Sequence, residues 1–266
     1  MPKLRLTILG CGSSGGVPRL GGLWGDCDPD DPRNRRTRCS LLVEREDDGG
    51  ITRVLIDTSP DMRAQLLQAG VGTLDAVVFT HDHADHTNGV DDLRQIVFNT
   101  RKRVPVWAEG STQDSLVARF GYAFVQPVDS PYPPILEMRT INGDVVVGGD
   151  GGDIVLTPFK VDHGAIDSLG FRINDVAYLP DVVALYQESR TALEGLDLWI
   201  VDVLRRKPHP THAHLDLALE WIAEFKPKRA ILTNMHIDMD YATVDAETPD
   251  HITPAYDGMV IETDVE

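Results

Sequence analysis

The chain has 266 residues, a length that suits one large domain or two small ones and allows a substantial core. Lys and Arg number 25 and Asp and Glu number 42, which gives a formal net charge of −17. This charge argues against DNA or another partner that is bound mainly through a phosphate backbone. The sequence shows no apolar run of membrane-spanning length and no signal-peptide segment at its start, so we expect no membrane association.

The three cysteines, Cys11, Cys27 and Cys39, are too few and too scattered for a disulfide framework. Sparse cysteines of this kind are typical of a reducing compartment. The sequence therefore predicts a cytoplasmic location.

Apolar runs of strand length recur along the chain, and several are continuous, which is typical of strands buried on both faces. The runs are 4–9, 54–56, 76–79, 104–107, 154–159, 176–179, 198–203 and 230–232. Between them, residues 59–61 are typical of a helix start and Gly70 of a helix end. A later helix is indicated by an apolar stripe at Leu215, Leu219, Ile222 and Phe225. Strands mixed with helices, with no obvious linker, predict one layered α/β domain over residues 1–266.

Histidines and aspartates cluster directly after the predicted strand 76–79, in the segment His81-Asp82-His83-Ala84-Asp85-His86. Ligand sites form at strand ends in α/β sheets, and imidazole with carboxylate suits Zn²⁺, Mn²⁺ or Fe²⁺. Four ligands on one turn cannot easily converge on one ion and leave room for a substrate. The spacing therefore predicts two neighbouring ions, one bound by His81 and His83 and the other by Asp85 and His86.

Further ligands are expected where other predicted strands end. His163 follows the run that begins at residue 154, Asp181 follows 176–179, and His236 follows 230–232. The Asp181 carboxylate has two oxygens and can bridge two ions. The sequence thus offers three additional ligands from separate strand ends.

These motifs resemble those of the metallo-β-lactamase superfamily of binuclear metallohydrolases. The segments 7–18, 33–40 and 255–260 are similar to a narrower branch of it. That branch contains the phosphodiesterase of the carbon–phosphorus lyase pathway and is related to tRNA 3′-processing endonucleases. The resemblance implies an αββα sandwich with the metals at one edge.

The resemblance also implies how the ligands are shared between two divalent ions, Zn²⁺ or Mn²⁺. By this resemblance, the first ion is bound by His81, His83 and His163, and the second is bound by Asp85 and His86. Asp181 lies between the two ions.

The chain departs from its relatives after the last predicted strand, where they carry Thr-His and this chain has Thr233-Asn234. His236 lies two residues on, and residues two apart in an extended segment face the same side. We therefore expect His236 to complete the second metal site, with Asn234 as an alternative oxygen ligand.

Within that branch, the phosphodiesterase of the carbon–phosphorus lyase pathway holds a structural zinc with cysteines of an early loop and a late histidine. This chain keeps only Cys27 there and has Ile237 at the late position. Because one thiolate cannot close a tetrahedral site, no structural zinc is expected.

The resemblance implies that His212 is the general acid, and an unperturbed imidazole pKa near 6.5 suits proton donation. Asp85, also a predicted metal ligand, is expected to be a catalytic residue together with His212. His214 competes for the acid role, contacts the substrate, or caps the following helix. Asp57, after the run 54–56, orients a metal-bound histidine or serves an ordinary turn.

Two loop motifs are candidates for substrate contact. Ser14, Gly15 and Gly16 belong to a glycine-rich turn whose amides a phosphate can approach. The basic run at Arg33, Arg35, Arg36 and Arg38 either recognises phosphate or is a solvated loop paired with Asp28, Asp30 and Asp31.

The leading prediction is a binuclear metal-dependent phosphodiesterase that acts on a small nucleotide-like or cyclic phosphate ester through a metal-bridging hydroxide. Three alternatives stay open: tRNA 3′ processing, thioester or lactam hydrolysis on the same fold, and a non-catalytic nucleotide-binding role. The expected partner is a small phosphorylated substrate, and a homodimer is compatible with the sequence.

Overall fold

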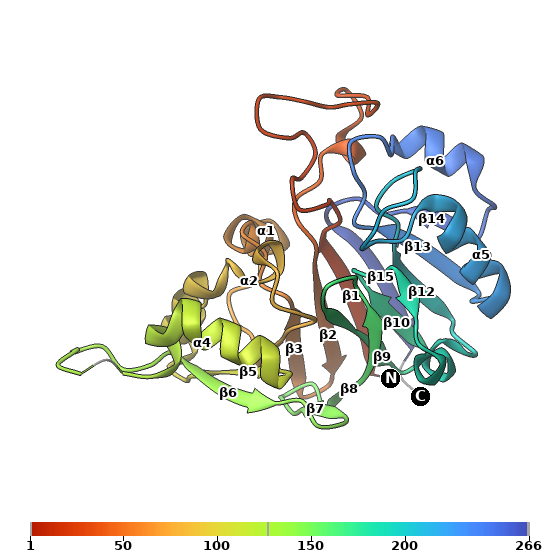
Figure 1. The fold of residues 1–266 in the computed structure, drawn as a ribbon. Helices are drawn as coiled ribbons and strands as arrows, with labels where there is room; N and C mark the ends of the chain where they lie inside the picture. Colours follow the sequence, from red (N-terminus) through yellow and green to blue (C-terminus); the bar gives the residue numbers. More distant parts are fainter. Residues whose placement is uncertain (1, 127, 265–266) are drawn as a thin grey trace. The chain divides into compact units, whose positions relative to one another are not determined.

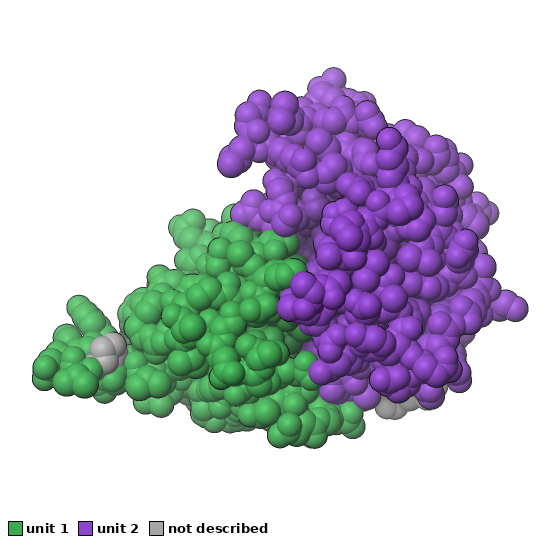
Figure 2. All heavy atoms as spheres, viewed as in Figure 1, with its two compact units in different colours: residues 1–9, 40–155, 260–266 green, residues 10–39, 156–259 purple. Residues whose placement is uncertain are grey.

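The computed structural model describes residues 2–126 and 128–264 (Figure 1). The chain divides into two compact units, each built from segments that are separated in sequence (Figure 2). Unit 1 comprises residues 1–9, 40–155 and 260–266, and unit 2 comprises residues 10–39 and 156–259. The expectation of a single domain over residues 1–266 stays a prediction.

The sheet of unit 1 has the strand order β15-β1-β2-β3-β4-β5-β6, so strands from the two ends of the chain pair with each other. Strands β3, β4, β5 and β6 pair in parallel, and their carboxyl ends therefore share one edge. The strands are β1 (Lys3–Gly10), β2 (Ser40–Asp47), β3 (Gly50–Ile56), β4 (Ala76–Val78), β5 (Val104–Ala108), β6 (Leu136–Thr140) and β15 (Met259–Asp264). Strand β7 (Val145–Val147) is not part of this sheet and pairs with the strand that begins at Ile154.

Three helices of unit 1 pack their apolar side chains against this sheet: α1 (Met62–Ala69), α3 (Leu93–Thr100) and α4 (Gly110–Phe124). The short helix α2 (Ala84–Thr87) contributes no side chain to this core. Leu66 of α1, Ile96 of α3 and Leu116 of α4 join Leu55 and Val106 of the strands in one buried core. Burial of such side chains contributes roughly 1.5–3 kcal/mol each.

Helix α1 begins at Met62, later than the predicted start at residues 59–61. The Ser59 hydroxyl accepts a hydrogen bond from the Asp61 amide at 3.1 Å, which makes a turn ahead of the helix. The predicted end at Gly70 is confirmed, because Gly70 adopts the left-handed φ of 69° that glycine tolerates best.

The sheet of unit 2 has the strand order β11-β8-β9-β10-β12-β13-β14. Strands β10, β12, β13 and β14 pair in parallel. Strand β8 runs in the same direction as β10, since both are antiparallel to β9. The strands are β8 (Ile154–Asp162), β9 (Asp167–Ile173), β10 (Val176–Leu179), β11 (Ala184–Leu185), β12 (Leu198–Asp202), β13 (Arg229–Thr233) and β14 (Ile252–Pro254).

The helices of unit 2 are α5 (Leu215–Phe225) and α6 (Tyr241–Glu247). The predicted stripe on α5 is correct at Leu215 and Ile222, whereas Ala218 is fully buried and Leu219 is only half-buried. The Phe225 ring meets Trp199 of β12 edge-on, with centroids 5.7 Å apart. This contact anchors α5 on the sheet.

Each predicted apolar run overlaps an observed strand, so those predictions are confirmed. Strands that mix charged and apolar residues, such as β2 and β9, were not among the predicted runs. Among the residues that the structure describes, no helix has both the length and the apolar character that a membrane span requires.

Asp257 anchors the long segment 10–39 within unit 2. Its carboxylate accepts hydrogen bonds from the amides of Cys11, at 3.1 Å, and Thr37, at 2.7 Å, and from the Thr37 hydroxyl at 2.6 Å. Burial raises the pKa of Asp257 to about 6, although these donors oppose the shift.

This raised pKa predicts a specific pH dependence of stability. An acid whose pKa is higher in the folded state stabilises the protein at low pH, and the effect is lost as pH rises through about 6. We expect the stability advantage of the metal-free wild type over Asp257→Asn to fall by roughly 1 kcal/mol between pH 5 and 7.5. Urea unfolding of both proteins at the two pH values measures it, and a pH-independent difference would contradict the assignment.

Candidate metal centre

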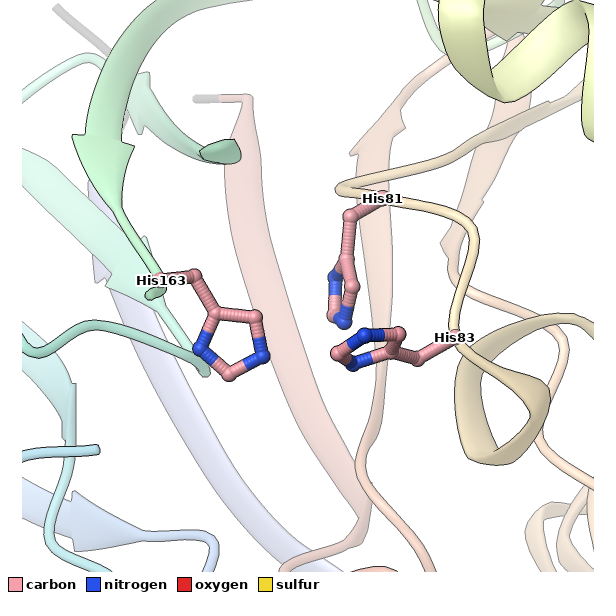
Figure 3. A group of neighbouring side chains, drawn as sticks. All are labelled: His81, His83 and His163. Carbon is pink, nitrogen blue, oxygen red and sulfur yellow. The ribbon is translucent and has the colours of Figure 1, made fainter. Parts of the chain in front are cut away.

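The histidine cluster of unit 1 follows β4 and leads into the short helix α2. His81 and His83 lie on the connecting loop with ring centroids 4.6 Å apart (Figure 3). The His86 ring on α2 lies 4.3 Å from that of His81. His86 Nε2 and Asp85 Oδ2 are 3.6 Å apart, too far for a hydrogen bond. That separation suits two atoms that each bind one ion at about 2.0–2.2 Å.

Asp57 orients this cluster from the end of the neighbouring strand β3. It is fully buried, and its carboxylate accepts hydrogen bonds from the Thr80 amide and hydroxyl, both at 2.8 Å, and from His86 Nδ1 at 2.7 Å. Burial raises the pKa of Asp57, and its interaction with His86 opposes that rise. Because Nδ1 of His86 carries the donated proton, Nε2 is the nitrogen suited to a metal.

The Thr80 hydroxyl extends the same network to His81. Its proton is donated to Asp57, so it accepts the proton of His81 Nδ1 at 2.9 Å. This arrangement again leaves Nε2 as the ligand nitrogen. The structure thus places Asp57 where the sequence predicted an orienting carboxylate.

The polar residues of unit 2 follow strands that run in one direction. His163 follows β8 (Figure 3), Asp181 follows β10, Asp202 ends β12 and Asn234 follows β13. His163 Nδ1 donates to the Thr211 carbonyl at 2.7 Å, and its Nε2 lies 3.7 Å from Asp181 Oδ1. One ligand-type atom each of His163, Asp181 and His212 lies within 4.8 Å of the others. Two of these three residues, His163 and Asp181, offer donors that fit a divalent cation.

His212 forms a pair with Asp202 that the sequence did not reveal. Its Nδ1 lies 2.9 Å from Asp202 Oδ2 and 3.4 Å from Asp181 Oδ1. Asp202 is fully buried, and it also accepts the Val182 amide at 3.0 Å. Burial raises the pKa of Asp202, and His212 opposes that rise. One feature of the sequence could have pointed to Asp202, because it is the single carboxylate in the apolar run 198–203.

Asn234 and His236 occupy different surroundings. The Asn234 amide nitrogen donates to Asp202 Oδ1 at 3.1 Å and Asp181 Oδ1 at 3.3 Å, from a backbone with φ of 62°. His236 Nδ1 lies 3.0 Å from Asp238 Oδ1, and its Nε2 contacts the Arg19 guanidinium. The metal-ligand roles expected of His236, and alternatively of Asn234, stay predictions.

The candidate substrate-contact residues also lie in unit 2. Ser14 and Gly15 are exposed on a turn that the Gly16 amide closes by donating to the Ser13 carbonyl at 2.7 Å. His214 precedes α5, is half-buried and makes no side-chain capping hydrogen bond. Their contacts with substrate stay predictions.

The basic run divides into separate structural roles. Arg33 pairs with Asp31 at 2.7 Å, in line with a solvated loop. The Arg35 guanidinium lies over the Trp24 ring at 5.1 Å. Arg36 is not solvated, because it is buried and donates to Asn34 Oδ1 at 3.0 Å.

The cysteines are three buried, unpaired thiols. Cys27 Sγ lies 3.8 Å from the Arg36 guanidinium. The expected lack of a structural zinc stays a prediction.

The family model described as the beta-lactamase superfamily domain matches residues 52–237. The chain belongs to this superfamily. The predicted resemblance and the α/β fold class are therefore confirmed. Membership also supports the predicted enzyme class, a metal-dependent hydrolase.

A solved structure described as a new diphosphatase from the PhnP family is similar over nearly the whole chain. It has 35% identity and a TM-score of 0.87, and the match covers 99% of this chain and 98% of that one. The predicted similarity to the narrower branch is thus confirmed.

Curated relatives match over part of their length. An octanoyltransferase of Porphyromonas gingivalis is 34% identical over 261 residues, which cover 96% of this chain and 51% of that protein. A ribonuclease Z of Bradyrhizobium sp. is 29% identical over 144 residues, which cover 53% of this chain and 45% of that protein. The chain spans about half the length of the curated relatives it matches.

The contacts of Asp57 predict a role in metal affinity. Asp57→Asn retains a side chain that tolerates the left-handed φ of 63° but removes the charge facing His86. We expect metal binding to weaken about 10- to 100-fold, the usual effect of losing a ligand's hydrogen-bond partner. Competition with a chromogenic chelator measures the affinity. Exposed Asp48→Asn is the matched control, and equal affinities for the two variants would refute the role.

Proposed function

We propose that this chain is a metal-dependent phosphodiesterase acting on a small nucleotide-like or cyclic phosphate ester. The observation that carries the proposal is the His212–Asp202 pair, which lies beside His163 and Asp181 at the ends of parallel strands. A proton donor next to metal-ligating groups is what cleavage of a phosphate ester requires. The similarity to a diphosphatase of the PhnP family supports the choice of phosphorus as the reacting centre.

We assign His81, His83 and His163 to one divalent ion and Asp85 and His86 to a second, with Asp181 shared. Bound ions supply Lewis acidity and activate water at neutral pH. Zn²⁺ and Mn²⁺ both accept these donors.

His212 donates a proton to the leaving oxygen in this proposal. The Asp202 carboxylate holds its Nδ1, so Nε2 is the atom that delivers the proton. Asp57 and Thr80 fix the orientation of His86 and His81.

RNA and acyl compounds are the two alternative substrate classes that the relatives suggest. The match to ribonuclease Z favours RNA, whereas the net charge of −17 opposes a long polyanion. The octanoyltransferase name belongs to a protein of which this chain spans 51%, so acyl chemistry is an outcome to be tested. Cytoplasmic location and a homodimer stay predictions.

The decisive test is hydrolysis of bis(p-nitrophenyl) phosphate by metal-stripped protein reloaded with Zn²⁺ or Mn²⁺. We expect metal-dependent turnover, and we expect kcat to fall about 10²- to 10⁴-fold in His212→Ala because the general acid is lost. His251→Ala, which removes an exposed histidine, is the control. Turnover of thioesters or lactams but not of the phosphodiester would contradict the proposal.

A further inference from the structure

Helices α1 and α3 of unit 1 border a groove that the proposed function does not use. The side-chain amide of Asn99, on α3, donates to the carbonyl of Gly72, just beyond α1, at 2.8 Å. The cavity between the two helices has a volume of about 490 Å³. Each helix has eight residues, so the groove is about 12 Å long, or about two helical turns.

The groove is lined by apolar side chains of two kinds. Met62, Leu66 and Ile96 form its floor and are at most 5% exposed. Leu67 and Phe98 line the same groove, yet they are 65% and 53% exposed. Large apolar side chains exposed next to a buried apolar floor are typical of a surface that another molecule covers.

Cations without an acidic partner lie in this groove and directly beside it. Arg63 lines the groove from α1, and the exposed turn Arg101-Lys102-Arg103 follows α3. None of these four side chains forms an ion pair with a described residue. Their charges are therefore available to a binding partner.

The acids of the groove offset little of this positive charge. Asp91 accepts hydrogen bonds from Arg94 and from the Tyr122 hydroxyl, both at 2.9 Å. Asp92, the other acid that lines the groove, makes no ion pair with a described residue. Four unpaired cations therefore stand against one unpaired acid, on a chain whose net charge is −17.

The shape and the charge of this face together select the kind of occupant. A membrane surface is too flat to reach the buried floor of a groove between two helices. A nucleic acid brings negative charge but no apolar side chains to cover Leu67 and Phe98. An amphipathic helix brings an apolar stripe with charged flanks. Acidic flanks complement the unpaired cations, whereas the acidic remainder of the chain repels them.

We propose that the groove between α1 and α3 binds an acidic amphipathic helix of a partner protein. The apolar side chains of that helix cover Leu67 and Phe98, and its carboxylates pair with Arg63 and the turn 101–103. This interaction goes beyond the proposed function. Neither groove helix carries a residue that we assign to metal binding or to proton donation.

A synthetic peptide is the probe for this groove. It is a fluorescently labelled helix of about 14 residues, with leucines along one face and glutamates elsewhere. We expect saturable binding, measured by fluorescence anisotropy, with a Kd of about 1–100 μM. A peptide with lysines in place of the glutamates is expected to bind at least about 10-fold more weakly. Equal binding of the two peptides, or no saturable binding of the acidic one, would overturn the proposal.

Variants of the groove locate the binding. We expect Leu67→Ser and Phe98→Ser each to raise the Kd about 10-fold, because an apolar anchor is lost. Lys102→Glu is expected to weaken binding of the acidic peptide and to strengthen binding of the lysine peptide, a reversal that a folding defect does not produce. Val146→Ser, which truncates an exposed apolar side chain of β7, is the matched control. Wild-type affinity in both groove variants would refute the site.

Two further measurements test other occupants. Self-association in sedimentation velocity that is lost in Phe98→Ser would make a second copy of the chain the occupant. Flotation with vesicles of equal parts phosphatidylcholine and phosphatidylserine, lost in the same variant, would make it a membrane surface. Either result would overturn the proposal.

Activity measurements keep this inference distinguishable from the proposed function. Turnover of bis(p-nitrophenyl) phosphate is expected to be the same in Leu67→Ser and Phe98→Ser as in the wild type. If the wild type shows no turnover, the phosphodiesterase proposal fails, and the peptide titrations still decide whether the groove binds an acidic helix.

Discussion

A buried carboxylate that accepts a histidine Nδ1 proton occurs in each unit, and the arrangement of the candidate site depends on these two pairs. Asp57 binds His86 at 2.7 Å and Asp202 binds His212 at 2.9 Å. Each carboxylate lies at the carboxyl end of a parallel strand, β3 or β12. Burying a carboxylate costs free energy, and backbone amides next to each strand end help to offset that cost. The result is a fixed tautomer in each partner histidine.

Asn234 has a related electrostatic role in this chain. Its amide group donates to both Asp181 and Asp202, two carboxylates that would otherwise repel each other. A neutral side chain that only donates through its nitrogen holds these oxygens without adding charge. Asparagine at position 234, where relatives carry the histidine of a Thr-His pair, therefore does more than remove one imidazole, because it holds Asp181 and Asp202 together.

Much of the fold was accessible from the sequence because β4, β10, β12 and β13 are short and almost wholly apolar. The clustered metal-ligand candidates were accessible too, since residues 81–86 follow such a strand directly. Strand β2 was missed because charged residues fill its second half. The contact of Arg19 with His236 joins residues far apart in the sequence, and Asp202 meets His212 only because the loop after β12 folds back. No local sequence pattern contains either contact. The same limitation applies to His236, whose neighbours are set by a hairpin more than two hundred residues earlier.

The pairing of β1 with β15 has a consequence for the order in which unit 1 is completed during synthesis. The two strands are far apart in the sequence, so β1 is made well before β15, which begins at Met259. Until β15 has been made and has paired, one edge of β1 exposes backbone groups that can pair with another chain. The growing chain therefore passes through a stage with an open sheet edge, and β15 protects β1 from aggregation once it is in place.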